Sequence, residues 1–149
     1  AYRAVPLTGA PVSRSSRALQ IVFTAPETWL DLSPSDQQLL CDQAQPYGPL
    51  FTWLDGQLQE HGPRPWSALR EALRGHPYES VAVHDISRLH QDITSDPAEL
   101  QAILRLERPR HLQERMDQAL ADNDLDLYQT LLPELLEAKQ AISQGLNQT

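Results

Sequence analysis

The stretch DPAELQAILRLERPRHLQERMDQALAD, residues 96–122, has the strongest periodicity in the chain and decides its fold. Asp96 stands where a helix N-cap belongs, and Pro97 follows at the first helical position, where its missing N–H costs nothing. Apolar side chains then recur at helical spacing, apart from a gap around Pro109: Leu100, Ile103, Leu104, Leu112, Met116, Ala119 and Leu120. This pattern predicts one long helix with a bend at the proline.

A second arm follows the short acidic turn Asn-Asp-Leu-Asp at 123–126. Its apolar positions have the same spacing, and they are Tyr128, Leu131, Leu132, Leu135, Ala138 and Ile142. The two arms are expected to form an antiparallel pair. If Leu131 and Leu135 face the first arm, Leu132 and Leu136 lie about 100° round the helix and stay partly uncovered. They meet either the rest of this chain, as ordinary core, or another protein, and the sequence leaves both readings open.

Proline residues divide the chain before the hairpin into short helices. Residues 1–12 are expected to be an irregular arm, and the first helix begins near Ser13 and ends at Pro26. That helix is apolar round most of its circumference, so we expect it at the centre of a bundle. Further helices are predicted at 26–30, 33–45, 48–61, 65–74 and 78–89. The predicted fold class is all-α, with five or six short helices in a bundle subdomain over 13–95, a helical hairpin with a long first arm over 96–144 and a tail over 145–149.

Composition supports the all-α class and limits the function. Apolar residues make up 40% of the 149 residues and are mostly Leu and Ala, which favours helices over strands. The net charge of −8 argues against direct nucleic-acid binding, because affinity for phosphate comes mainly from Lys and Arg. Cys41 is the only cysteine, so we expect a small core residue and no internal disulfide. No apolar run approaches the roughly 20 residues of a membrane span. We expect a soluble, cytoplasmic monomer with no membrane contact.

Charge is unevenly placed along the chain. Residues 1–25 hold three arginines and no acid, whereas residues 116–149 hold six acids against Lys139 alone. Arg14 and Arg17 stand three residues apart on one helix face, beside the apolar Leu19. Two guanidinium forks over an apolar slot suit an acidic, hydrophobic peptide or a small anionic ligand. The alternative is that both arginines are solvated helix ends.

No pattern in the sequence indicates catalysis or a metal site. The five histidines form no pair at ligand spacing with a carboxylate, and surface positions are expected for them. Asp122, Asp124 and Asp126 lack the glycine and closing glutamate of a calcium loop, so they are expected to cap the last helix. We therefore expect no enzyme activity, no metal and no cofactor.

Four segments, in this order, resemble the C-terminal helicase-binding domain of bacterial DnaG-type primases. They are SRSSRALQIVFTAPETW at 13–29, YGPLFTWLDGQLQEHG at 47–62, ALREALRGHP at 68–77 and LQERMDQALADNDLDLYQTLLPELLEAKQ at 112–140. The resemblance covers nearly the whole chain. It departs from the family at Pro133, inside the last helix, and in the neutral tail that ends in Asn-Gln-Thr.

The resemblance implies a non-catalytic module whose hairpin docks on the hexameric replicative helicase and couples primer synthesis to the replication fork, in the cytoplasm at the nucleoid. The helicase-binding residues expected on this basis are Tyr128, Leu132, Leu136 and Lys139. The first helix of this chain is similar to the region that, in the family, binds the acidic tail of single-stranded-DNA-binding protein. This implies an acidic-peptide site formed by Arg14, Arg17, Leu19 and His84, although the family's lysines are not matched.

Overall fold

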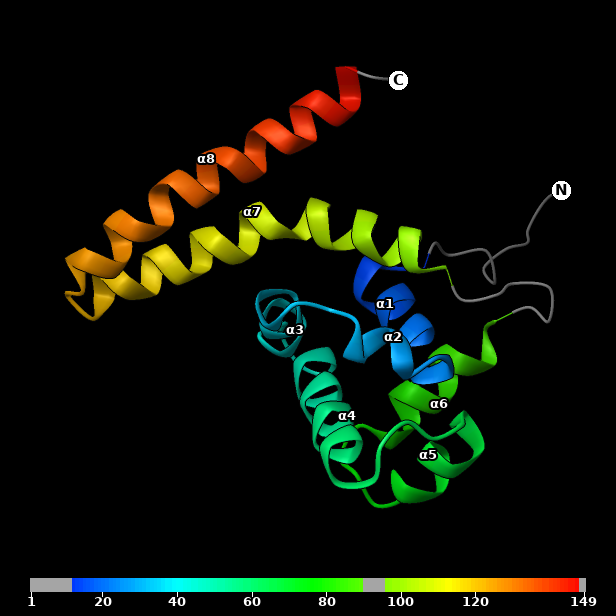
Figure 1. Ribbon diagram of the computed structural model, residues 1–149. Coiled ribbons are helices and arrows are strands. Elements are labelled where there is room, and N and C mark those ends of the chain that lie inside the picture. Colours follow the sequence, from blue (N-terminus) through cyan, green and yellow to red (C-terminus); the bar gives the residue numbers. More distant parts are fainter. Residues whose placement is uncertain (1–11, 90–95, 148–149) are drawn as a thin grey trace, which may run out of the picture.

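The computed structural model describes residues 12–89 and 96–147 (Figure 1). Within these ranges the chain forms eight helices and no strand, so the predicted all-α class is confirmed. The helices are α1 Arg14–Thr24, α2 Glu27–Leu30, α3 Pro34–Cys41, α4 Tyr47–His61, α5 Trp66–Ala72, α6 Glu79–Ser87, α7 Pro97–Ala121 and α8 Leu125–Asn147. Most of the predicted arm over 1–12, together with His90, lies outside the described residues.

Side-chain caps set several helix starts. The Ser13 and Ser33 hydroxyls accept hydrogen bonds from the backbone N–H of Ser16 and Asp36, each at 3.1 Å. The Asp96 carboxylate accepts from the Ala98 N–H at 2.9 Å, and Pro97 occupies the first turn of α7. Each cap accepts a hydrogen bond from a backbone N–H that the helix itself leaves unpaired. Serine and aspartate are favoured at these positions for that reason, and proline is favoured at the next one because it has no N–H, so these residues predict helix starts in the sequence.

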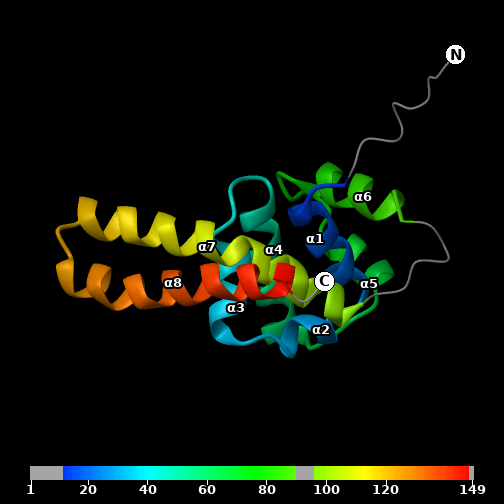
Figure 2. The same ribbon diagram turned by 90° about the horizontal axis from the view of Figure 1, so that it is seen from above.

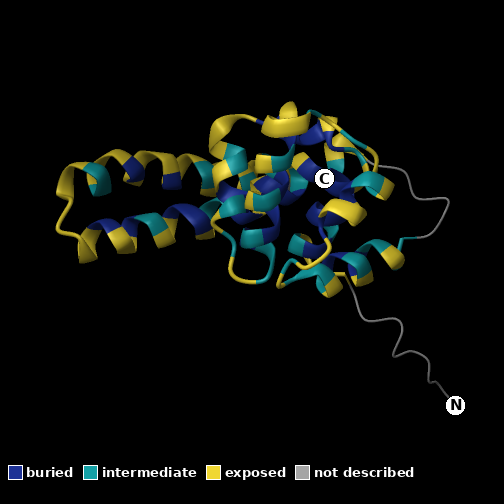
Figure 3. Ribbon diagram, turned by 90° about the horizontal axis from the view of Figure 1, so that it is seen from below, coloured by how far each residue is buried: buried dark blue, intermediate teal, exposed yellow. Residues whose placement is uncertain are grey.

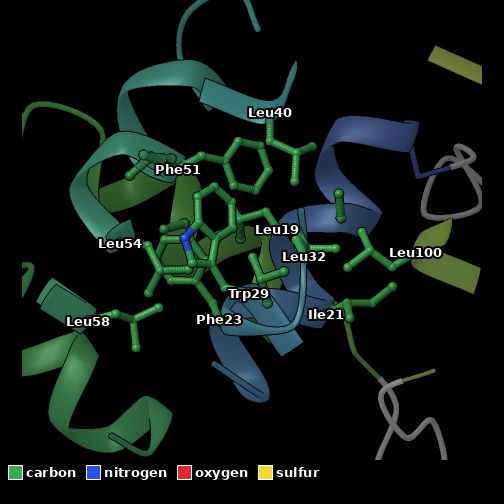
Figure 4. Close-up of a cluster of buried hydrophobic side chains, with 14 of the residues drawn as sticks. Leu19, Ile21, Phe23, Trp29, Leu32, Leu40, Phe51, Leu54, Leu58 and Leu100 are labelled. Atoms are coloured by element: carbon green, nitrogen blue, oxygen red, sulfur yellow. The ribbon is translucent and has the colours of Figure 1, made fainter. Parts of the chain in front are cut away.

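The bundle core is built around α1, as the sequence predicted. Leu19, Ile21 and Phe23 are fully buried (Figure 4). Helix α1 contacts α2, α4, α5, α6 and α7, and the rings of Trp29 and Phe51 stack beside it at 6.0 Å. The half-buried Cys41 packs against this core, and burial raises the pKa of its thiol.

Helix α7 belongs to two cores. Leu100, Ile103 and Leu104, in its first half, complete the bundle core. Leu112 and Met116, beyond Pro109, form a second core with residues of α8. The sequence assigned all of 96–144 to the hairpin, and the first half of α7 also packs into the bundle core. A helical stripe shows which side of a helix is buried but does not show which element covers it.

The distal part of the hairpin projects beyond the bundle (Figure 2). Leu131 and Leu135 face α7 and are buried at 1% and 4% exposure, as predicted. Asn123 takes a left-handed conformation, with φ of 61°, in the turn between the arms. The Asp124 carboxylate accepts from the Leu127 N–H at 3.1 Å, so Asp124 caps α8 as the sequence predicted for the acidic cluster.

The two internal prolines differ in their effect. Helix α7 arches along its length, with Pro109 near its middle, whereas α8 runs straight through Pro133 (Figure 1). A proline inside a helix is expected to bend it, yet α8 shows no kink (Figure 1). Pro133 has no N–H to donate to the Gln129 carbonyl. Both residues are exposed, so this carbonyl lies on the solvent-facing side of α8, where water can hydrate it. The predicted tail at 145 is wrong, because α8 continues to Asn147.

Candidate functional site

The outer face of α8 is the first candidate surface. Leu132 and Leu136 are 40% and 54% exposed, so neither belongs to the core of this chain. Leu125 is 55% exposed and precedes Leu132 by seven residues, which places it on the same side of the helix. We call Leu125, Leu132 and Leu136 the outer leucine stripe. Figure 3 shows exposed residues along the outer sides of the projecting hairpin.

The other predicted helicase-binding residues lie beside this stripe. Lys139 is exposed one turn beyond Leu136. Tyr128 is half-buried and packs against the second core, so only part of its side chain is accessible. Leu125 was not predicted as part of this surface, because it follows the acidic turn and was assigned to it. Its seven-residue spacing to Leu132 was the available signal.

The basic end of α1 is the second candidate surface, and its arginines are already paired within the chain. The Arg14 guanidinium lies 2.6 Å from the Glu107 carboxylate of α7. Arg17 donates two hydrogen bonds to Glu99, at 2.8 and 2.7 Å, in a bidentate pair. These hydrogen bonds hold the pKa of Glu99 below its ordinary value of 4.5 and raise the pKa of Arg17.

The apolar half of the predicted peptide site is absent from the surface. Leu19 is fully buried in the bundle core, so it cannot line a slot for a bound side chain. His84 is exposed on α6, which packs against α1. The prediction of an acidic-peptide site here is corrected on two points: α7 supplies the carboxylates that the arginine forks bind, and Leu19 faces inward. Helix α1 packs most of its residues, Leu19 among them, into the bundle core.

His111 departs from the expectation that the histidines lie at the surface. It is 5% exposed, and its Nε2 lies 2.9 Å from the Asp42 carboxylate, which joins α7 to the end of α3. Its Nδ1 is buried without a hydrogen-bond partner. In the described ranges, no three residues among His, Cys, Asp and Glu come together in a way that could hold a metal ion. None of the described helices combines the length and the apolar character of a membrane span.

Comparison with known proteins adds no relative: no family model, no curated protein and no solved structure matches the chain. Contiguous exposed apolar side chains on one helix face are typical of protein-binding surfaces.

Proposed function

We propose that this chain is a non-catalytic interaction module of a bacterial primase, which binds the hexameric replicative helicase through the outer leucine stripe of α8. The observation that carries the proposal is that this stripe lies exposed on a hairpin that projects beyond the bundle. The four sequence segments that resemble the primase domain give the partner its identity. In this role the chain acts at the replication fork in the cytoplasm, as a monomer until it meets the helicase.

The chemistry of the stripe suits a helix-to-helix contact. Leu125, Leu132 and Leu136 offer aliphatic side chains at one-turn and two-turn intervals, which is the spacing that a groove between partner helices accepts. Around them α8 is acidic, and Lys139 supplies a lone cation next to the stripe. Aliphatic anchors give most of the affinity in such a contact, whereas rim charges mainly set the rate of association and its salt dependence.

The decisive experiment measures complex formation between the chain and a purified replicative helicase hexamer, by gel filtration and by fluorescence anisotropy. We expect a stable complex with the native chain. Replacing both Leu132→Ala and Leu136→Ala should weaken binding by more than about 1 kcal/mol per leucine, while the melting temperature stays unchanged. The proposal is wrong if no complex forms at protein concentrations of tens of micromolar.

Leu30→Ala is the matched control. Leu30 is 51% exposed, like the stripe leucines, but it lies on α2 of the bundle. This variant should bind the helicase as the native chain does. Lys139→Glu tests the rim, and we expect it to change the salt dependence of binding more than the affinity. Equal losses in the Leu30 variant and in the stripe variant would show that the effect is not specific to α8.

A further inference from the structure

A groove separates the second half of α8 from the arched first half of α7. Because α7 bends towards the bundle and α8 does not, the two helices diverge on the bundle side of the hairpin (Figure 1). The central hollow of this groove has a volume of about 260 Å³ and lies between Leu104 and Arg108 of α7 and Ala138 and Ala141 of α8. Asp36 of α3 closes one side.

The groove continues beyond the central hollow in both directions. Arg105 also lines a neighbouring hollow of about 170 Å³, together with Leu106 and Ile142. Arg108 and Ala138 also line a third hollow of about 350 Å³, which reaches Ser33 and Glu134. Each outer hollow shares lining residues with the central one, so the three hollows adjoin along the groove, which we call the channel.

Aliphatic and small residues line part of the groove, beside the charged side chains of Arg105, Arg108 and Asp36. On α8, Ala138, Ala141 and Gly145 leave room for a bound chain to approach the helix backbone. On α7, Leu106 is 45% exposed where it faces this channel, although leucine favours burial. Aliphatic side chains of a bound segment would therefore remove apolar surface from water on both sides.

Arg105 gives the groove its charge. Its side chain is exposed, and it makes no ion pair or hydrogen bond with any part of the chain that the structure describes. Arg108 differs, since it is paired with the Asp36 carboxylate and donates to the Ser35 carbonyl. The described part of the chain therefore leaves the Arg105 guanidinium without a carboxylate partner. This group complements a carboxylate, which guanidinium binds bidentately.

The opposite end of the channel has the opposite charge. Glu134 and Glu137 line the third hollow, while Arg105 lies at the other end. A bound segment thus meets a positive field at one end and a negative field at the other, which fixes its direction.

We propose that this groove binds an aliphatic, acidic segment of a partner protein, with its carboxylate on Arg105 and its aliphatic side chains in the hollow between Leu104 and Ala141. The site is separate from the outer leucine stripe. Ala141 follows Leu132 by nine residues, which at about 100° per residue places them on opposite sides of α8. The groove and the stripe can therefore be occupied together, and the proposal does not depend on the identity of the helicase partner.

The test uses the full chain, isotope-labelled, and, as the probe, an end-blocked leucine-rich peptide whose aspartate residues lie at one end only. In an NMR titration, we expect shifts at backbone amides of 101–108 and 138–145, saturating with peptide. A peptide with lysine in place of aspartate, and one with serine in place of leucine, should not bind. Shifts confined to the start of α1, or no shifts at millimolar peptide, would overturn the proposal.

Two variants of the chain make the test specific. Arg105→Glu should weaken peptide binding at least about tenfold, because it removes a charge-assisted pair and adds a repulsion. Ala141→Trp places a large side chain at an exposed position in the hollow and should block binding without unfolding the chain. Arg70→Glu, at an exposed arginine of α5, makes the same charge change elsewhere and should leave binding unaltered.

Three outcomes count against the groove as a peptide site. Equal weakening by Arg70→Glu and Arg105→Glu would mean that the peptide senses only overall charge. Undiminished binding to the Ala141→Trp variant would place the peptide elsewhere. If the free chain dimerises in sedimentation and Ala141→Trp abolishes the dimer, the occupant is a second copy of this chain, and the proposal is wrong.

Discussion

At the scale of single residues, Gly48 and Gly56 of α4 are chemically alike but sit in opposite surroundings. A Cβ on Gly48 would lie 2.1 Å from the Gln43 carbonyl oxygen and 2.7 Å from that of Cys41, and backbone atoms cannot easily move aside. A Cβ on Gly56 would meet nothing within 4 Å. We expect Gly48→Ala to lower the free energy of unfolding by about 3 kcal/mol through overpacking.

Gly56→Ala is the control for that prediction within the same helix. It should raise the free energy of unfolding by about 0.5–1 kcal/mol, because alanine loses less backbone entropy than glycine in a helix interior. Chemical denaturation midpoints measure both changes. A shift in the same direction for the two variants would contradict the close approach at Gly48.

The Arg17–Glu99 pair predicts a dependence of stability on pH. Its hydrogen bonds lower the pKa of Glu99 in the folded chain, so its contribution is fully present above the ordinary value of 4.5 and is lost as the pH falls through the lowered pKa. The Glu99 side chain is 40% exposed, so solvent screening limits this contribution to less than about 1 kcal/mol.

Glu99→Gln should therefore reduce stability at neutral pH, and the difference from the native chain should vanish in acid. Thermal unfolding across a pH series measures this difference. Glu71→Gln is the matched control, because Glu71 pairs with Arg74 in an exposed contact. It should cost almost nothing at any pH. A difference that persists unchanged into strong acid would show that Glu99 acts through packing and not through its charge.

At the scale of helices, Pro133 interrupts the hydrogen bonding of α8 without bending it. Pro133→Ala restores the backbone donor to the Gln129 carbonyl and improves helix propensity, so the free energy of unfolding should rise, by at most about 3 kcal/mol. Thermal denaturation followed by circular dichroism measures the gain. Glu134→Ala, at the exposed neighbouring position, should change stability by less than about 0.5 kcal/mol. A loss of stability in Pro133→Ala would mean that the proline ring makes packing contacts that alanine cannot replace.

Local signals explain which elements the sequence predicted well. Ser33-Pro34 and Asp96-Pro97 act through hydrogen bonds and dihedral angles within one helical turn, so sequence alone located these helix starts. The spacing in α8 likewise separated the buried Leu131 and Leu135 from their exposed neighbours.

Long-range pairings explain what the sequence could not predict. Arg14 meets Glu107 across 93 residues, and His111 meets Asp42 across 69 residues. The residues near Arg14 in the sequence do not predict that Glu107 is its partner, so the start of this helix was interpreted as a possible binding site for an anion. The groove beside α8 was hidden for the same reason. It arises from the divergence of two helices, which depends on how α7 rests on the bundle.

At the scale of the whole molecule, α7 links two cores of unequal size. The bundle core holds the large buried side chains of α1 and α4, whereas the distal core, among the residues that the structure describes, has four buried side chains, Leu112, Met116, Leu131 and Leu135. Because local stability follows the amount of apolar burial, the distal core should open at a lower free energy than the bundle. Native-state hydrogen exchange should therefore show faster exchange around Leu131 than in α1 or α4.

Leu135→Ala tests this division of the molecule directly. Removing a buried leucine costs about 2–5 kcal/mol, and here the loss should fall on the distal core alone. Amide exchange should accelerate in the distal halves of α7 and α8, while α1 and α4 keep their protection. Leu19→Ala is the counterpart in the bundle, and it should accelerate exchange in α1 and α4. Equal acceleration in both cores after Leu135→Ala would mean that α7 couples them into one cooperative unit, so that the outer leucine stripe is as rigid as the bundle that supports it.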